Sequence, residues 1–127
     1  MILVDSCGWL EILGASPLGE AYRPALASQD ELLVPTVCLL EVGRRLLTWR
    51  GEAEAAEGIA LMSQATLVPL DETLAIAASR VGPATGLPCA DSIIYATARR
   101  HDAELWTHDA HFRGLPGVRF VEAPAGA

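Results

Sequence analysis

The first ten residues, MILVDSCGWL (1–10), decide the fold of this chain. The apolar run Ile2–Val4 predicts a short buried strand, and Ser6 can cap a helix that carries Trp9. Asp5 stands between these two elements. The stretch therefore predicts a strand that leads directly into a helix, with an acidic residue at the carboxyl end of the strand.

Strand-like and helix-like segments alternate along the rest of the chain. Further strands are predicted at Leu32–Val34, Leu67–Pro69, Leu105–Thr107 and Val118–Val121. Helices are predicted from Pro17 through Tyr22 to Leu26, from a Thr36 cap to Trp49, and at Glu52–Ala65, Glu72–Val81 and Ala90–His101. This alternation predicts an α/β fold with a mostly parallel, about five-stranded sheet that is covered on both faces.

Composition indicates a single folded domain. The chain has 127 residues, of which 51% are hydrophobic, and no linker-like tract divides it. We expect one domain over residues 1–122 and a flexible tail, APAGA, over residues 123–127. No apolar run approaches the roughly 18 residues of a membrane span, and the N-terminus has no basic region typical of a signal sequence. The three cysteines form no CxxC motif, so we expect a reduced, cytoplasmic protein.

The net charge of −7 argues against a nucleic-acid-binding protein, because phosphate contacts usually require a positive surface. All nine basic residues are arginines. Any nucleic-acid function must therefore depend on few and local contacts.

Acidic residues collect where the predicted topology forms a crevice. In open α/β sheets, ligands bind outside the carboxyl ends of the strands. Asp5 ends the first strand, while Thr107 and Asp109 end the fourth. Glu41 and Asp91 lie in the early turns of helices that begin at the same edge. Four carboxylates at one place repel one another unless a cation such as Mg²⁺ or Mn²⁺ binds between them.

Each acidic residue also has a purely structural interpretation. Asp5 can cap the following helix, and Asp91 can interact favourably with its helix dipole. Glu41 can lie at the edge of an amphipathic helix, with Arg44 or Arg45 as its ion-pair partner. Only the four residues together favour a metal site.

At these residues the chain resembles the PIN-domain family, and within it the VapC ribonuclease toxins of toxin–antitoxin pairs. The resemblance lies in MILVDSCGWL, TVCLLEVGRRL, CADSIIYATA and LWTHDAHF, which occur in the order of the family. It implies a three-layer α/β/α sandwich and a Mg²⁺- or Mn²⁺-dependent endoribonuclease. The acidic cluster of the family falls on Asp5, Glu41, Asp91 and Asp109, with supporting hydroxyls at Ser6 and Thr107.

The resemblance also implies partners. The RNA substrate would contact arginines, for which Arg44, Arg45 and Arg113 are the candidates. The toxin would pair with a small antitoxin protein, either as a homodimer or in a heteromer, and without a membrane. Apolar side chains that could face the antitoxin are Trp9, Leu10, Leu13 and Trp49.

Three alternatives remain open: a stand-alone PIN nuclease without an antitoxin, a non-catalytic module that binds a cation or a protein, and a zinc or redox site built on Cys7, Cys38 and Cys89. The segment His108–Asp109–Ala110–His111 resembles a histidine metal site, but a zinc site needs a third ligand. His101 precedes the strand that His108 follows, which places it at the other edge of the sheet. We therefore expect the histidines to have surface or supporting roles. In the family that the chain resembles, an acidic residue is common at the position of His111.

Overall fold

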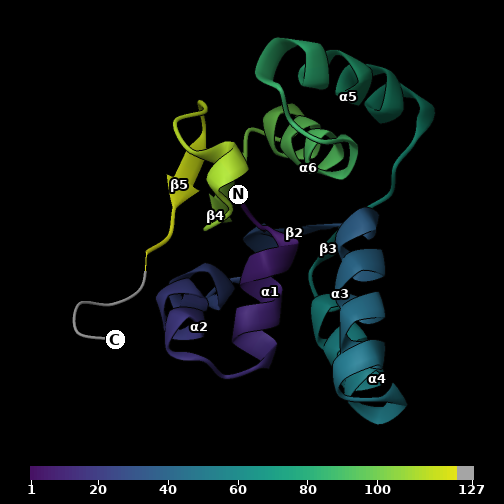
Figure 1. Cartoon of the computed structure of the whole chain (residues 1–127), viewed down its shortest axis with the longest axis vertical. Helices are drawn as coiled ribbons and strands as arrows, with labels where there is room; N and C mark the ends of the chain where they lie inside the picture. Colours follow the sequence, from purple (N-terminus) through teal and green to yellow (C-terminus); the bar gives the residue numbers. More distant parts are fainter. Residues whose placement is uncertain (123–127) are drawn as a thin grey trace.

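The computed structural model describes residues 1–122, and the predicted flexible tail lies outside the described residues. Five parallel strands form one sheet in the order β3-β2-β1-β4-β5 (Figure 1). Their bounds are β1 (Ile2–Val4), β2 (Leu32–Pro35), β3 (Thr66–Val68), β4 (Glu104–Thr107) and β5 (Val118–Phe120). The predicted strands are therefore confirmed, each within one residue at either end.

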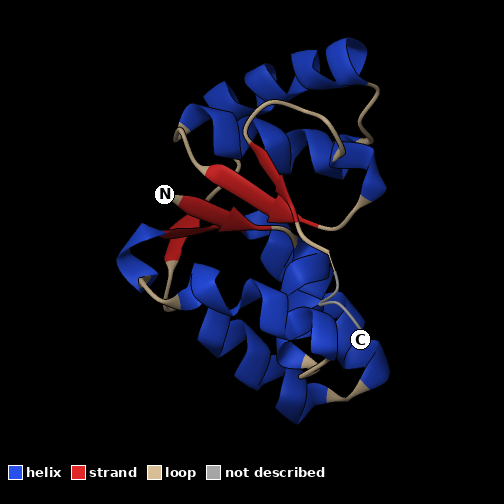
Figure 2. Cartoon of the chain, turned by 90° about the vertical axis from the view of Figure 1, so that its left-hand side faces the viewer, coloured by secondary structure: helices blue, strands red, loops and turns tan. Residues whose placement is uncertain are grey.

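Helices cover both faces of the sheet, which gives the three-layer sandwich expected from the sequence (Figure 2). Four helices form one layer: α1 (Ser6–Leu13), α2 (Pro17–Tyr22), α3 (Thr36–Trp49) and α4 (Glu52–Met62). The other layer contains α5 (Glu72–Thr85) and α6 (Cys89–Arg100), which lie together on the far side of the strands in Figure 1. Three short 3₁₀ helices, η1 (Arg23–Leu26), η2 (Gln29–Glu31) and η3 (Ala110–Phe112), lie in the connections.

The strand order reverses direction at β1, and this reversal creates the crevice. From β1 the chain moves outward through β2 to β3, and then crosses through α5 and α6 to β4 on the other side of β1. The flanking helices consequently lie on opposite faces beside the β1–β4 pair. At such a switch point the connections diverge and leave space beyond the carboxyl ends of the strands. β1 and β4 are in register with Val4 beside Trp106, so their ends point into the same space.

Burial of the central strands supplies most of the core. Leu3, Val4 and Leu105 have no exposed surface, and all four residues of β2 are buried. Apolar side chains on both faces of a strand are typical of parallel sheets that are covered by helices on each side. Among the described residues, none of the helices is long and apolar enough to cross a membrane.

Several predicted helix ends were wrong by a few residues. Asp5, and not Ser6, caps α1, and Thr36 is the first residue of α3 and not its cap. α4 ends at Met62, before Ala65, because the chain must extend into β3 at Thr66. α5 continues past Val81 and past Pro83 until Gly86, whose φ of +80° ends it in the left-handed conformation. Packing of α5 on α6 evidently outweighs the low helix propensity of a proline in the last turn.

The contribution of the sheet core can be tested with a pair of leucines. Leu105→Ala should lower the free energy of unfolding by about 2–5 kcal/mol, because it leaves a cavity beneath the central strands. Leu40→Ala removes the same atoms from a side chain that is 67% exposed, and it should change stability by less than about 0.5 kcal/mol. Urea unfolding followed by circular dichroism measures both. Equal effects of the two substitutions would contradict this description of the core.

A candidate metal-dependent active site

Asp5 is the most buried of the predicted acidic residues, with 3% of its surface exposed. Its Oδ1 accepts a hydrogen bond from the Ser6 amide at 2.7 Å, and its Oδ2 accepts one from Thr107 Oγ1 at 2.7 Å. Cys7 Sγ lies 3.4 Å from the same Oδ2. Asp5 thus caps α1, as its structural interpretation suggested, and is held in a fixed orientation at the carboxyl end of β1.

A second hydrogen bond joins α1 to α3 at the crevice. Ser6 Oγ donates to Glu41 Oε1 at 2.7 Å, which fixes the Glu41 carboxylate close to Asp5. Within the part of the chain that the structure describes, neither Arg44 nor Arg45 lies within 4.0 Å of Glu41, so the alternative ion pair is not formed. The supporting position predicted for Ser6 is therefore matched by a direct contact.

Thr107 links the other side of the crevice to Asp5. Its hydroxyl donates to Asp5 and accepts a hydrogen bond from the Asp109 amide at 3.0 Å. Asp109 in turn caps η3, with Oδ1 accepting from the His111 amide at 2.9 Å. The Thr-x-Asp spacing therefore has a local reason: the threonine positions one acidic residue by its hydroxyl hydrogen and the other by its lone pair.

His111 is a member of the site that the sequence interpretation left aside. Its Nδ1 lies 3.1 Å from Asp91 Oδ2 and 3.3 Å from Asp109 Oδ1. Each of the three residues offers one ligand atom, and these atoms all lie within 4.8 Å of one another. One sequence feature could have predicted that His111 belongs here. It lies two residues after Asp109, at a position that is often acidic in the family that the chain resembles.

The four acidic residues predicted from the sequence line one cavity of about 240 Å³, together with Ser6, Cys7, Leu10 and Arg45. They reach it from four separate elements: Asp5 from the end of β1, Glu41 from α3, Asp91 from α6 and Asp109 from the end of β4. All four are therefore brought close only by the tertiary fold. Oxygen ligands of this kind suit Mg²⁺ and Mn²⁺, so the donor set fits a hard divalent cation.

Burial disfavours the charged forms of two of these carboxyl groups, Asp5 and Asp91. Burial raises the pKa of Asp5 to about 6, against the lowering effect of its hydrogen bonds from Thr107, Cys7 and Ser6. Burial also raises the pKa of Asp91, and the neighbouring negative charge of Asp109 acts in the same direction. A bound divalent cation would reverse both effects, because it stabilises the ionised carboxylates.

The three arginines proposed to contact substrate are not equivalent. Arg45 lines the cavity, and its guanidinium also lies 3.9 Å above the Trp49 ring. Arg44 is exposed on the same helix. Arg113 lies over the Phe120 ring at 3.8 Å and within 3.9 Å of Glu122, so its guanidinium is engaged away from the acidic residues.

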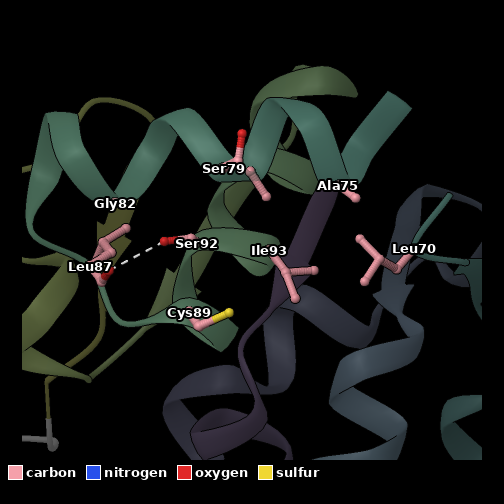
Figure 3. A pocket seen from close by; sticks show the side chains of 9 residues that line it. Leu70, Ala75, Ser79, Gly82, Leu87, Cys89, Ser92 and Ile93 are labelled. Carbon is pink, nitrogen blue, oxygen red and sulfur yellow. Dashed lines mark hydrogen bonds between the residues drawn. The ribbon is translucent and has the colours of Figure 1, made fainter. Parts of the chain in front are cut away.

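The cysteines do not form a shared site in the described part of the chain. Cys7 lies beside Asp5, and burial raises its pKa to about 12, so it stays protonated. Cys38 is fully buried, and burial raises its pKa as well. Cys89 instead lines an apolar cavity of about 370 Å³ between α5 and α6, with Leu87 and Ile93 (Figure 3). Among described residues the cysteines join no group of three metal ligands, which leaves the zinc or redox alternative without support.

The raised pKa of Asp5 predicts how the stability of the metal-free protein depends on pH. The unfolded chain ionises Asp5 near its ordinary pKa of 3.8, whereas the folded chain does so near 6. The folded state therefore binds more protons between these values, and stability falls as the pH rises through this window. Asp5→Asn removes the cost of ionising the buried group. In the presence of chelator, the free energy of unfolding of the variant relative to wild type should rise between pH 4 and pH 7 by about 2–3 kcal/mol. A difference that does not change with pH would show that Asp5 is not destabilised by ionisation.

Comparison with known proteins supports this architecture. A family model described as the PIN domain matches residues 2–118. The chain is similar to a solved toxin–antitoxin complex from Klebsiella pneumoniae, with a TM-score of 0.79, 21% identity, and coverage of 94% of this chain and 96% of that chain. It is also similar to VapC20 of Mycobacterium tuberculosis, a toxin that cleaves the sarcin–ricin loop, with a TM-score of 0.70 and 16% identity over 85% of this chain and 88% of that chain. No curated protein sequence matches the chain. The matched segment includes all four acidic residues and the hydroxyls that position them, and the chain belongs to the PIN domain family.

Proposed function

We propose that this protein is a Mg²⁺- or Mn²⁺-dependent endoribonuclease that acts as the toxin of a toxin–antitoxin pair. The observation that carries the proposal is the convergence of Asp5, Glu41, Asp91 and Asp109 on one open cavity at the switch point of a PIN fold. The raised pKa values of Asp5 and Asp91 mean that ionising these two groups lowers the stability of the metal-free protein, which favours a role beyond folding. The similarity to solved toxins supports the choice of substrate class.

Each residue has a part in the proposed reaction. Asp5, Asp91 and Asp109 would hold the cation, and Glu41, which Ser6 fixes, would bind metal or accept a proton from the attacking water. The bound cation supplies activation of water and neutralisation of charge on the phosphate. Thr107 keeps Asp5 and Asp109 at a constant separation, and Arg45 is placed to contact a phosphate of the substrate at the edge of the cavity.

The acidic net charge is compatible with this proposal. Bound cations would offset the negative charge inside the cavity, and exposed Arg44 and Arg45 lie on the helix that carries Glu41. RNA would thus meet positive charge close to the acidic residues. Such a surface predicts binding with few phosphate contacts and a shallow dependence on salt.

Cleavage can be tested with acid-to-amide variants. Asp5→Asn and Asp109→Asn should each reduce cleavage of a panel of RNAs by about 10²- to 10³-fold, because each removes charge stabilisation at the cation. Asp30→Asn makes the same chemical change at an exposed position outside the cavity and should retain full activity. Wild-type activity should disappear with chelator and return with Mn²⁺ or Mg²⁺.

The product ends provide a control against contaminating ribonucleases. Water attack on phosphorus that breaks the bond to the 3′ oxygen leaves a 5′-phosphate and a 3′-hydroxyl. Metal-independent ribonucleases that use the 2′-hydroxyl instead leave a cyclic phosphate. Full activity of Asp5→Asn, or cyclic ends, would refute the assignment, whereas metal binding without any cleavage would favour the cation-binding module.

The proposed antitoxin has an apolar surface available to it. Leu40, Leu47 and Trp49 on α3 are each more than half exposed, and a small groove between α1, α3 and α4 is lined by Leu10, Leu13 and Trp49. Of the residues predicted to face a partner, Trp9 does not qualify, because it is 1% exposed and packs in the core. Leu10 also lines the acidic cavity, so a segment bound in the groove would lie next to the proposed active site. Pairing of the chain as a homodimer stays a prediction that light scattering can test.

Partner binding can be tested at Trp49. If a small neighbouring reading frame encodes the antitoxin, Trp49→Glu should weaken the complex by about tenfold or more, because exposed tryptophans are frequent binding hot spots. Ile76→Glu is a matched control on α5, in the other helical layer, with 55% of the residue exposed in wild type. Isothermal titration calorimetry with the purified partner measures both. If only Ile76→Glu weakened the affinity, the partner would bind the face formed by α5 and not the face formed by α3.

A further inference from the structure

We propose that His111 is a metal ligand in this site, and that its nitrogen makes the site prefer Mn²⁺ over Mg²⁺. This inference rests on the proposed cation site, and it concerns a residue outside the four-carboxylate set. It deepens the proposed function because it names the ion that the site selects.

The position of the imidazole is the first reason. η3 begins directly after Asp109, and the His111 amide donates to the Asp109 carboxylate, which turns the side chain back toward the crevice. Nδ1 consequently lies between two carboxylates that come from different elements, Asp91 of α6 and Asp109 after β4. The imidazole therefore lies where a cation bound between the two carboxylates would meet it.

The distances are the second reason. Mg²⁺ and Mn²⁺ favour octahedral sets with metal–ligand distances of roughly 2.1 Å, which places neighbouring ligand atoms about 3.0 Å apart. Nδ1 lies 3.1 Å from Asp91 Oδ2 and 3.3 Å from Asp109 Oδ1. Both spacings of Nδ1 are therefore close to those of neighbouring ligands around one ion, and all three ligand atoms lie within 4.8 Å of one another.

The chemistry of nitrogen gives the ion preference. Mg²⁺ selects oxygen ligands almost exclusively, whereas imidazole suits transition metals. Mn²⁺ accepts both carboxylate oxygens and imidazole nitrogen, so a mixed set of two aspartates and one histidine should bind it more tightly than Mg²⁺. The same ligand set with an acidic residue at this position would lose that preference.

One rival interpretation uses the same contacts. A protonated His111 would form ion pairs with Asp91 and Asp109 and would act as a substitute for the cation. The metal would then displace the imidazole, and no nitrogen would be bound to it. The two interpretations differ in a direct observable, which is the presence of nitrogen in the first coordination sphere of the bound ion.

Pulsed electron paramagnetic resonance of the Mn²⁺-loaded protein tests the proposal. The wild-type protein should show ¹⁴N couplings of a coordinated imidazole, and these should change to ¹⁵N couplings when histidine is labelled with ¹⁵N. His111→Gln should remove them, while His101→Gln, at the end of α6, should leave them intact. Labelling of the wild-type protein shows whether any histidine is bound even if a variant fails to fold, and the absence of histidine couplings there would overturn the proposal.

Affinities measured by competition give a second readout. His111→Gln should weaken Mn²⁺ binding by about tenfold and Mg²⁺ binding much less, and His111→Asp should shift the ratio toward Mg²⁺. Mn²⁺ bound without histidine couplings, or no Mn²⁺ bound at all, would overturn the proposal. Nitrogen coordination in a protein that cleaves no RNA would support His111 as a ligand and would refute only the proposed nuclease activity.

Discussion

The buried carboxylate of Asp5 is the constraint on which the rest of the structure depends. It ends the central strand, caps the first helix and accepts a hydrogen bond from Thr107 at the end of the neighbouring strand. An ionised group in such a place is costly unless donors or a cation satisfy it. The Ser6 amide and the Thr107 hydroxyl supply such donors, and the Ser6 hydroxyl places Glu41 beside the same group.

This constraint connects stability with the proposed chemistry. The hydrogen bonds to Asp5 lower its pKa, but burial has the larger effect and raises it. The metal-free protein is therefore less stable at neutral pH than its packing alone would allow, and a cation that binds the folded state would recover stability. Functional sites commonly carry such a local cost, and the surrounding sheet, whose central strands are almost completely buried, is rigid enough to bear it.

The proposed function requires an acidic protein to act on a polyanion. Under the proposed function, the positive charge that meets the substrate at the crevice would come from Arg44 and Arg45 on one helix and from a bound cation. Arg113, which the sequence offered as a third contact, is held over an aromatic ring beside an acidic residue. The position of basic residues relative to the crevice is thus a better indicator of nucleic-acid binding than their number in the chain.

The sequence by itself determined the α/β class, the five strands and the four acidic positions, because strand periodicity and the strand–acid–helix order are local properties. It could not determine that α5 continues past Pro83, since packing on α6 decides this. It also named Trp9 and Trp49 alike as candidates to face a partner, whereas the structure buries Trp9 and leaves Trp49 56% exposed. Only the tertiary structure decided the position of His111, because its contact with Asp91 joins residues that are 20 positions apart through the packing of α6 against β4. A local sequence pattern identifies side chains that could bind a metal or react, but the fold sets the distance between side chains from two different segments.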